Sequence, residues 1–177
     1  VVGSAETDAS EHAHVLIDVK NPHLWNGLAD PYCYTCEASI LMGEEITDTV
    51  VVTYGYRSFR VDAETGFYLN GKSLPLHGVA RHQDRLDKGW AISKADHEED
   101  IALIKELGAN TIRLAHYQHD QYFYELCNRT GFVLWAEIPF ISQFIPTQEA
   151  YNNTISQMTE LVAQNYNHPA IMFWGIS

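Results

Sequence analysis

From residue 74 onward, short apolar runs alternate with longer segments in which apolar residues recur every three or four positions. The four apolar runs are Leu74–Val79, Thr111–Tyr117, Phe132–Ala136 and Ile171–Ile176. This alternation is typical of parallel strands joined by crossover helices, so we predict three strand–helix units and the first strand of a fourth. No glycine-rich phosphate loop follows any of the runs, which disfavours a nucleotide-binding doubly wound sheet.

The first helical segment carries recognisable signals at both ends. Ser93 is followed three residues later by Asp96, which is a capping-box pattern, and Gly108 is a natural residue to end the helix. The positions expected to be buried are Ile101, Ile104 and Leu107.

The two later helices are predicted in the same way. The second surrounds Tyr122–Leu126 and should end at Gly131, and the third should begin at a capping box formed by Thr154 and Gln157. The positions of the third helix expected to be buried are Ile155, Met158, Leu161 and Val162.

Before residue 63 the pattern contains no helical period. The strand-like runs there are His14–Val19, Tyr32–Leu41, Thr49–Tyr54 and Gly55–Val61, and turn residues separate them. Short strands at such spacing indicate an antiparallel sandwich, and Asn70-Gly71 adds a hairpin signal just after it. We therefore divide the chain into residues 1–62, part of a β-sandwich, and residues 63–177, an α/β domain.

Composition narrows the classes of function. The hydrophobic fraction of 46% is sufficient for a packed core. The 11 basic and 23 acidic residues give a net charge of −12, which disfavours binding to nucleic acids and to anionic membranes. No apolar run approaches the length of a membrane span, and no signal peptide is recognisable. The sequence leaves the compartment open, the bacterial cytoplasm and periplasm both being compatible with it.

The candidate site lies where the parallel strands end. In parallel α/β folds, ligands bind at the carboxyl ends of the strands. Arg113, His116 and Tyr117 lie within or just after the second apolar run, His82 follows the first, and Glu137 follows the third. We expect these side chains to lie close together.

The order of several short motifs resembles glycoside hydrolase family 2, which includes β-galactosidases, β-glucuronidases and β-mannosidases. Arg113–Tyr117 is similar to the family's Arg-x-x-His-Tyr strand, and Tyr54–Arg57 is similar to its Phe-Gly-Phe-Arg strand. The other segments that carry the resemblance are Asn21–Trp25, Asp30–Tyr32, Phe67–Lys72, His77–His82 and Asn167–Trp174.

The resemblance implies an all-β part followed by an α/β part: the end of an immunoglobulin-like sandwich and the first half of a (β/α)8 barrel. It also implies a retaining glycosidase with a carbohydrate substrate. In the family, an Asn-Glu pair that supplies the general acid/base directly follows the Trp-containing strand, and the nucleophilic glutamate comes later. Both positions lie beyond Ser177. We therefore assign no catalytic residue within the chain and expect the isolated chain to be inert.

The resemblance also suggests roles for individual residues. It makes His82 and His116 ligands of sugar hydroxyls, whereas the alternative is a pair of histidines satisfied by loop backbone. Glu137 becomes a carboxylate next to the substrate, not the acid/base. Arg113 lies inside an apolar strand and needs a carboxylate partner, which would be Glu137 or one of the later glutamates.

Three further residues complete the candidate site. Asp84 is either a substrate ligand or a solvated loop residue. Tyr117 and Trp174 would support the site, although the mid-strand place of Trp174 also fits the core. Trp25 and Trp135 are expected in the core. The segments His82–Arg85 and Tyr117–Asp120 resemble β-galactosidase-type members of the family more than glucuronidases.

Two other classes of function remain open. One is a carbohydrate-binding or structural module without chemistry, and the other is a metal-dependent hydrolase built on His82, His116 and Glu137. We predict no metal and no cofactor, because Ile141 and Gln143 occupy the places where magnesium-using members of the family have a Glu and a His. Pairing of two copies through the open edge of the half barrel would give a homo-oligomer.

Overall fold

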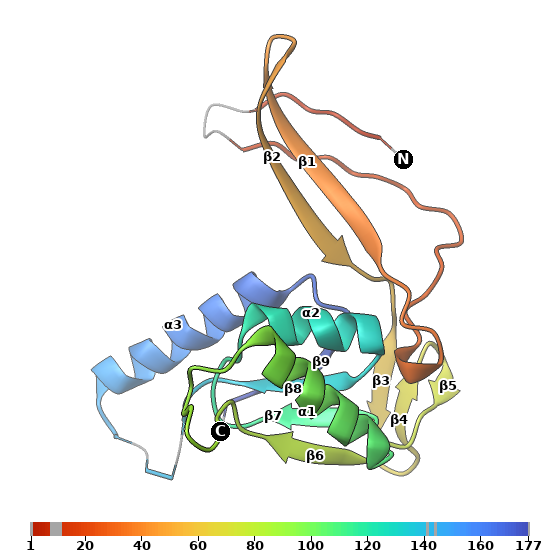
Figure 1. Cartoon of the computed structure of the whole chain (residues 1–177). Helices are drawn as coiled ribbons and strands as arrows, with labels where there is room; N and C mark the ends of the chain where they lie inside the picture. The colour runs from red at the N-terminus through yellow and green to blue at the C-terminus, as the bar shows by residue number, and fades with distance from the viewer. Residues whose placement is uncertain (1, 8–11, 141, 144, 177) are drawn as a thin grey trace.

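The computed structural model describes residues 2–7, 12–140, 142–143 and 145–176. Within these residues the chain forms a two-stranded antiparallel ribbon, a three-stranded antiparallel sheet and a four-stranded parallel sheet (Figure 1). None of the helices in these ranges has the length and apolar character needed to cross a membrane.

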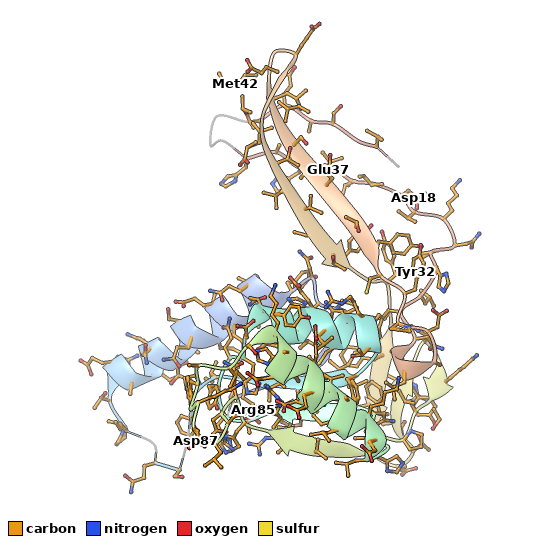
Figure 2. All side chains as sticks on the ribbon, viewed as in Figure 1. Asp18, Tyr32, Glu37, Met42, Arg85 and Asp87 are labelled. Atoms are coloured by element: carbon orange, nitrogen blue, oxygen red, sulfur yellow. The ribbon has the colours of Figure 1, made fainter. Side chains whose placement is uncertain are left out.

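The ribbon consists of β1 (Tyr34–Met42) and β2 (Glu45–Tyr54), which pair from Tyr34↔Tyr54 to Met42↔Glu45. It projects away from the remainder of the molecule, with Met42 near its tip (Figure 2). Most of its side chains are exposed. The predicted strand His14–Val19 was wrong, because these residues form no strand pairing in the structure.

The second sheet contains β3 (Phe59–Asp62), β4 (Gly66–Leu69) and β5 (Lys72–Ser73). The hairpin predicted at Asn70-Gly71 is confirmed, and both residues have the positive φ angles (50° and 78°) that favour Asn-Gly in such turns. Since β3 pairs with β4, the division between residues 62 and 63 falls inside one hairpin and stays a prediction.

The parallel sheet contains the strands that position the candidate site. Their order is β6 (Gly78–Arg81), β7 (Thr111–Leu114), β8 (Val133–Glu137) and β9 (Ile171–Gly175). The crossover helices are α1 (Lys94–Glu106), α2 (Gln121–Thr130) and α3 (Gln148–Asn165). The helices lie on one face of the sheet, as expected for the outer layer of a barrel (Figure 1).

Three of the four predicted helix ends are confirmed. Gly108 follows the C-cap residue Leu107 of α1 and has a φ of 77°. Ser93 and Asp96 form the reciprocal capping box, and Gly131 ends α2 in the left-handed conformation, with φ 87°. The predicted cap at Thr154 was wrong. Thr147 caps α3 instead by accepting a hydrogen bond from the backbone N–H of Ala150, which leaves Thr154 inside the helix.

Alternation along the strands divides the sheet into a covered face and an open face. Ile112, Leu114, Leu134 and Ala136 are fully buried in the core that the sheet shares with the helices. Trp135 points to the opposite face and is 41% exposed, so the prediction that it belongs to the core was wrong.

Of the helix positions predicted to be buried, Ile101, Ile104 and Leu161 are buried, and Met158 and Val162 are half-buried. Leu107, at the C-terminal cap of α1, is exposed, and so is Ile155 in α3, so both predictions were wrong. The prediction for Trp25 is confirmed: its side chain is fully buried, and its Nε1–H donates to the carbonyl oxygen of Asn128 over 2.8 Å. This hydrogen bond ties the N-terminal part of the chain to α2.

Candidate functional site

The carboxyl ends of β6, β7 and β8 bring together the residues expected there. Adjacent strands pair in register at Ala80↔Arg113 and Arg113↔Trp135, so Arg113 points to the same open face as Trp135. Glu137 lies two residues beyond Trp135 on the same strand and therefore points to that face as well. Register thus places Arg113 and Glu137 on the same face of the sheet, two residues apart along the strand direction.

Arg113 and Glu137 form a bidentate ion pair. The Nε of Arg113 lies 2.5 Å from Oε1 of Glu137, and its Nη2 lies 3.0 Å from Oε2. Glu137 is fully buried, and the hydrogen bond to this carboxylate raises the pKa of Arg113. A paired guanidinium is what a fully buried carboxylate requires, so the charge of Glu137 is neutralised at the site.

His116 joins this pair from the loop that follows β7. Its Nδ1 lies 3.1 Å from Nη2 of Arg113 and 3.5 Å from Oε2 of Glu137. Because a guanidinium only donates hydrogen bonds, Nδ1 of His116 accepts, and the neutral ring carries its proton on Nε2. His116 is therefore preset as a hydrogen-bond donor through Nε2.

His82 and Tyr117 extend the site from neighbouring loops. The rings of His82 and His116 meet edge to face, with centroids 5.1 Å apart. The ring of Tyr117 lies 6.2 Å from that of His82, and its hydroxyl oxygen accepts a hydrogen bond from the backbone N–H of Gln83 over 3.0 Å. Hence the loops after β6 and β7 hold three aromatic rings near the Arg113–Glu137 pair.

The two remaining predicted site residues are not part of this group. Asp84 is exposed, and the structure records no hydrogen bond or ion pair of its carboxylate with the described residues. Trp174 pairs with Ala136 in the sheet, which places it on the helix-facing side, whereas its neighbour Gly175 lies against Trp135 and Glu137. The functional roles proposed for all of these residues stay predictions.

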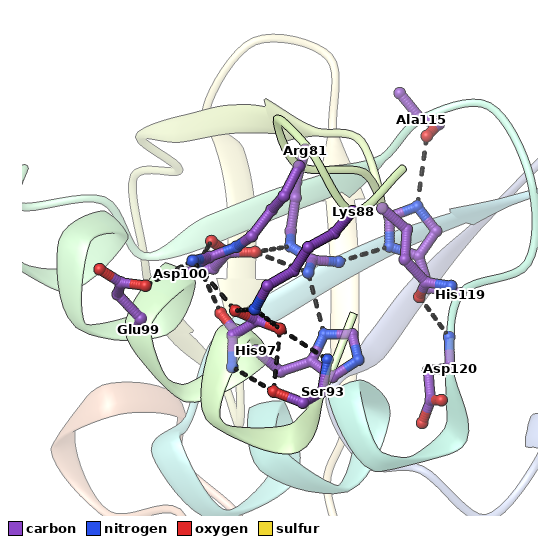
Figure 3. Close-up of polar contacts among 12 residues, drawn as sticks. Arg81, Lys88, Ser93, His97, Glu99, Asp100, Ala115, His119 and Asp120 are labelled. Carbon is purple, nitrogen blue, oxygen red and sulfur yellow. Dashed lines mark hydrogen bonds and ion pairs between the residues drawn. The ribbon is translucent and has the colours of Figure 1, made fainter. Parts of the chain in front are cut away.

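Sequence reasoning missed a buried polar cluster beneath the site. Arg81, at the end of β6, donates to Asp100 of α1 over 2.9 and 2.6 Å (Figure 3). Its guanidinium also packs over the ring of Phe123. It also donates to Nδ1 of His97 and to Nδ1 of His119, over 2.9 and 3.1 Å. The only sequence signal was an arginine ending an apolar strand, and its partners are 16 to 38 residues away.

The cluster reaches the site through His119. Its Nε2 donates to the carbonyl oxygen of Ala115 over 3.2 Å, directly before His116 (Figure 3). The peptide bond between Ala115 and His116 is cis. Arg81 therefore connects α1 and the end of β6 to the loop that carries His116.

Two buried histidines, His97 and His119, and the half-buried His168 make the stability of the chain depend on pH. Burial lowers the pKa of His119 to about 3 and that of His168 to about 4, and burial together with the Arg81 charge also lowers the pKa of His97. In the unfolded chain these rings take up protons near pH 6.5, whereas in the folded chain they stay neutral. Stability is therefore fully present above about pH 6.5 and falls as the pH drops towards 4, by up to about 1.4 kcal/mol per pH unit for each ring.

We expect the thermal midpoint of the whole protein to fall between pH 7 and pH 4.5, and to fall less steeply in the variant His119→Gln. The glutamine amide preserves a donor for Ala115 but does not titrate. Differential scanning calorimetry across this pH range measures the effect. If the thermal midpoint falls equally steeply with pH in both proteins, the titration of His119 does not contribute to this pH dependence.

The described residues contain no group of three or more His, Cys, Asp or Glu side chains placed to hold a metal ion. Of the two positions compared with magnesium-using relatives, Gln143 is exposed and Ile141 lies outside the described residues.

Comparison with known proteins identifies both parts of the chain. Residues 60–177 match the family model described as "Glycosyl hydrolases family 2, TIM barrel domain", and residues 1–57 match "Glycosyl hydrolases family 2". Among curated proteins, a β-glucuronidase of Bacteroides fragilis is 44% identical over 165 residues, covering 89% of this chain and 24% of that protein.

Solved structures give the same result. The crystal structure of an FMN-binding β-glucuronidase from Facaelibacterium prausnitzii is 50% identical, with a TM-score of 0.86 over 90% of this chain and 25% of that one. A putative β-galactosidase from Bacteroides fragilis is 40% identical, with a TM-score of 0.85 over 89% of this chain and 23% of that one. The chain thus spans about a quarter of these relatives, and the predicted fold, the end of a sandwich followed by the start of a TIM barrel, is confirmed.

Proposed function

The chain belongs to glycosyl hydrolase family 2, and on that premise we propose that the protein containing it is a retaining β-glycosidase whose terminal-sugar subsite includes His82, His116 and the Arg113–Glu137 pair. The observation that carries the proposal is the bidentate pair between Arg113 and the buried carboxylate of Glu137, with His116 held against it at the carboxyl ends of the strands. In a TIM barrel, catalytic and binding groups gather at this end.

Retaining hydrolysis requires two carboxyl groups about 5–5.5 Å apart, one to attack the sugar and one to protonate the leaving oxygen. Glu137 suits neither task, because both of its oxygens are engaged by Arg113. Its contribution is to fix Arg113 and, through it, the tautomer of His116. The acid/base and the nucleophile are assigned to residues outside the chain, so residues 1–177 alone are expected to be inactive.

Two terminal sugars are candidates. The segments His82–Arg85 and Tyr117–Asp120 favour a β-galactoside, whereas the relatives at 44% and 50% identity are named β-glucuronidases. The cation at this part of the site, Arg113, is neutralised by Glu137. A glucuronate carboxylate would therefore need a positive partner from another part of the protein, while the neutral hydroxyls of galactose would not.

The experiment is a panel of 4-nitrophenyl β-galactoside, β-glucuronide and β-mannoside offered to the whole protein. We expect hydrolysis with net retention at the anomeric centre, fastest with one of the first two substrates. The polypeptide of residues 1–177 is the control and should release no nitrophenol. If the whole protein binds sugar without hydrolysing it, the result would instead support a binding module. If the protein contains stoichiometric zinc and loses activity when the zinc is removed, the result would support a metal-dependent hydrolase.

A further inference from the structure

Trp90 is a large aromatic side chain that is left in solvent beside the candidate site. It is 64% exposed, and its indole stacks on the ring of Tyr117 with centroids 4.5 Å apart and an interplanar angle of 28°. The hydroxyl of Tyr117 is in turn held by the backbone N–H of Gln83. Tyr117 therefore supports one face of Trp90, and a broad apolar surface remains available to a ligand.

A row of rings connects Trp90 to the proposed sugar subsite. Tyr117 lies between Trp90 and His82, with a centroid distance of 6.2 Å to His82. His82 then contacts His116, whose Nδ1 lies 3.5 Å from Glu137. Trp90 is the exposed end of this row of rings, and the Arg113–Glu137 pair lies at its other end.

The loop that presents Trp90 is held in place by several charged contacts. Arg85 and Gly89 pair across a tight turn, and Asp87 at its tip has a φ of 64° (Figure 2). Arg85 binds Asp100 and the carbonyl oxygen of Asp96, over 2.5 and 2.7 Å.

Further contacts fix the loop to the first two turns of α1. Arg85 forms an ion pair with Glu99, and Lys88 Nζ binds both carboxylate oxygens of Asp96, over 2.7 and 2.9 Å (Figure 3). Ion pairs with exposed members contribute little to stability by themselves. A loop that is already fixed, however, loses little entropy when a ligand binds to it, which favours recognition.

We propose that Trp90, supported by Tyr117, is a stacking platform for the leaving group of the glycoside. This inference rests on the proposed glycosidase function. The class of group it accepts is flat and apolar on one face: an aromatic aglycone or the C–H face of a second pyranose ring. Both present apolar surface to an indole, and an aromatic ring adds the interaction between π systems.

The test compares Trp90→Ala and Trp90→Phe in the whole protein with the matched control Leu86→Ala, which alters a side chain that is 90% exposed on the same loop. Calorimetry gives the Kd of three non-hydrolysable ligands: the methyl and phenyl 1-thio-β-glycosides and a thio-linked disaccharide. Each is prepared for both candidate sugars.

Trp90→Ala should weaken binding of the phenyl glycoside about threefold to tenfold and leave the methyl glycoside unchanged. Trp90→Phe should retain most of the affinity, and Leu86→Ala should bind as the unaltered protein does. If affinity falls for the phenyl glycoside alone, the group that stacks on Trp90 is an aromatic aglycone. If affinity for the disaccharide falls by a similar factor, Trp90 also accepts a second sugar.

The platform is overturned if Trp90→Ala binds both the phenyl glycoside and the disaccharide as tightly as the unaltered protein does, or if it loses as much affinity for the methyl glycoside as for the phenyl glycoside. These outcomes are distinct from failure of the proposed function. If the protein hydrolyses the nitrophenyl glycosides and the Trp90 variants bind all ligands normally, the glycosidase function stands and the platform is rejected. If Trp90→Ala weakens binding of the phenyl glycoside alone but the protein hydrolyses nothing, the platform stands and the glycosidase function is rejected. No binding of any ligand rejects both.

Discussion

Replacing Arg113 with methionine is expected to lower the free energy of unfolding by about 3 kcal/mol. This value is at the low end of the cost of breaking a buried ion pair, because the side chain of Arg113 is itself partly exposed. The side chain of Glu137 is 1% exposed, and both of its oxygens depend on this guanidinium. Without it, a buried carboxylate either stays charged without a partner or takes up a proton. Urea unfolding of the whole protein measures the loss.

The double variant Arg113→Met/Glu137→Leu separates the charge effect from lost packing. It removes both charges at once, so it should be more stable than Arg113→Met alone. The exposed pair Arg129–Glu125 provides the matched control, and Arg129→Met should leave the urea midpoint unchanged. If Arg113→Met unfolds at the same urea concentration as the unaltered protein, the buried carboxylate of Glu137 does not need Arg113 as its partner.

Features encoded by a few neighbouring residues could be predicted from the sequence. Ser93 with Asp96 and the glycine at position 131 act within one helical turn, so the residue types suffice to locate the helix ends. The start of α3 was missed because Thr154 with Gln157 matches the capping-box pattern, whereas Thr147, the actual cap, is followed three residues later by Ala150, which has no side chain to complete a box. Local pattern alone cannot decide between them.

Burial depends on what covers each face of the sheet, and this is not a local property. Trp135 has the same apolar character as its neighbours in β8, but it points away from the helices. The positions of the site residues likewise depended on which face of the sheet each strand presents. Arg113 and Glu137 could be placed together because parallel strands align their carboxyl ends, whereas Trp174 faces the other side after a register irregularity between Leu134 and Trp135.

The cluster around Arg81 could not be predicted, because its partners come from β6, α1 and the loop after β7. Nothing in the spacing of His97 and His119 distinguishes them from surface histidines. Their neutral state follows only from burial next to a guanidinium.

His116→Ala is expected to reduce kcat/KM of the whole protein about 100-fold, which is the cost of losing one preset hydrogen-bond donor that acts in a transition state. Arg113 occupies Nδ1 of His116, so the Nε2–H is the group left to donate to a sugar hydroxyl. If this hydrogen bond tightens as the sugar ring distorts, kcat should fall more than KM rises. Steady-state kinetics with the best nitrophenyl glycoside measures both.

Two further variants show whether the loss belongs to the donor or to the fold. His116→Gln places an amide N–H near the position of Nε2 and should recover part of kcat, which a purely structural role would not require. His23→Ala removes an exposed histidine that pairs with Asp30 in the N-terminal segment, and its kinetics should not change. If His116→Gln is as slow as His116→Ala and both have a lower thermal midpoint, His116 supports the loop and does not bind the sugar. Recovery by glutamine at an unchanged midpoint instead means that the Arg113–Glu137 pair orients a ligand-binding histidine, which links the buried ion pair to the chemistry of the site.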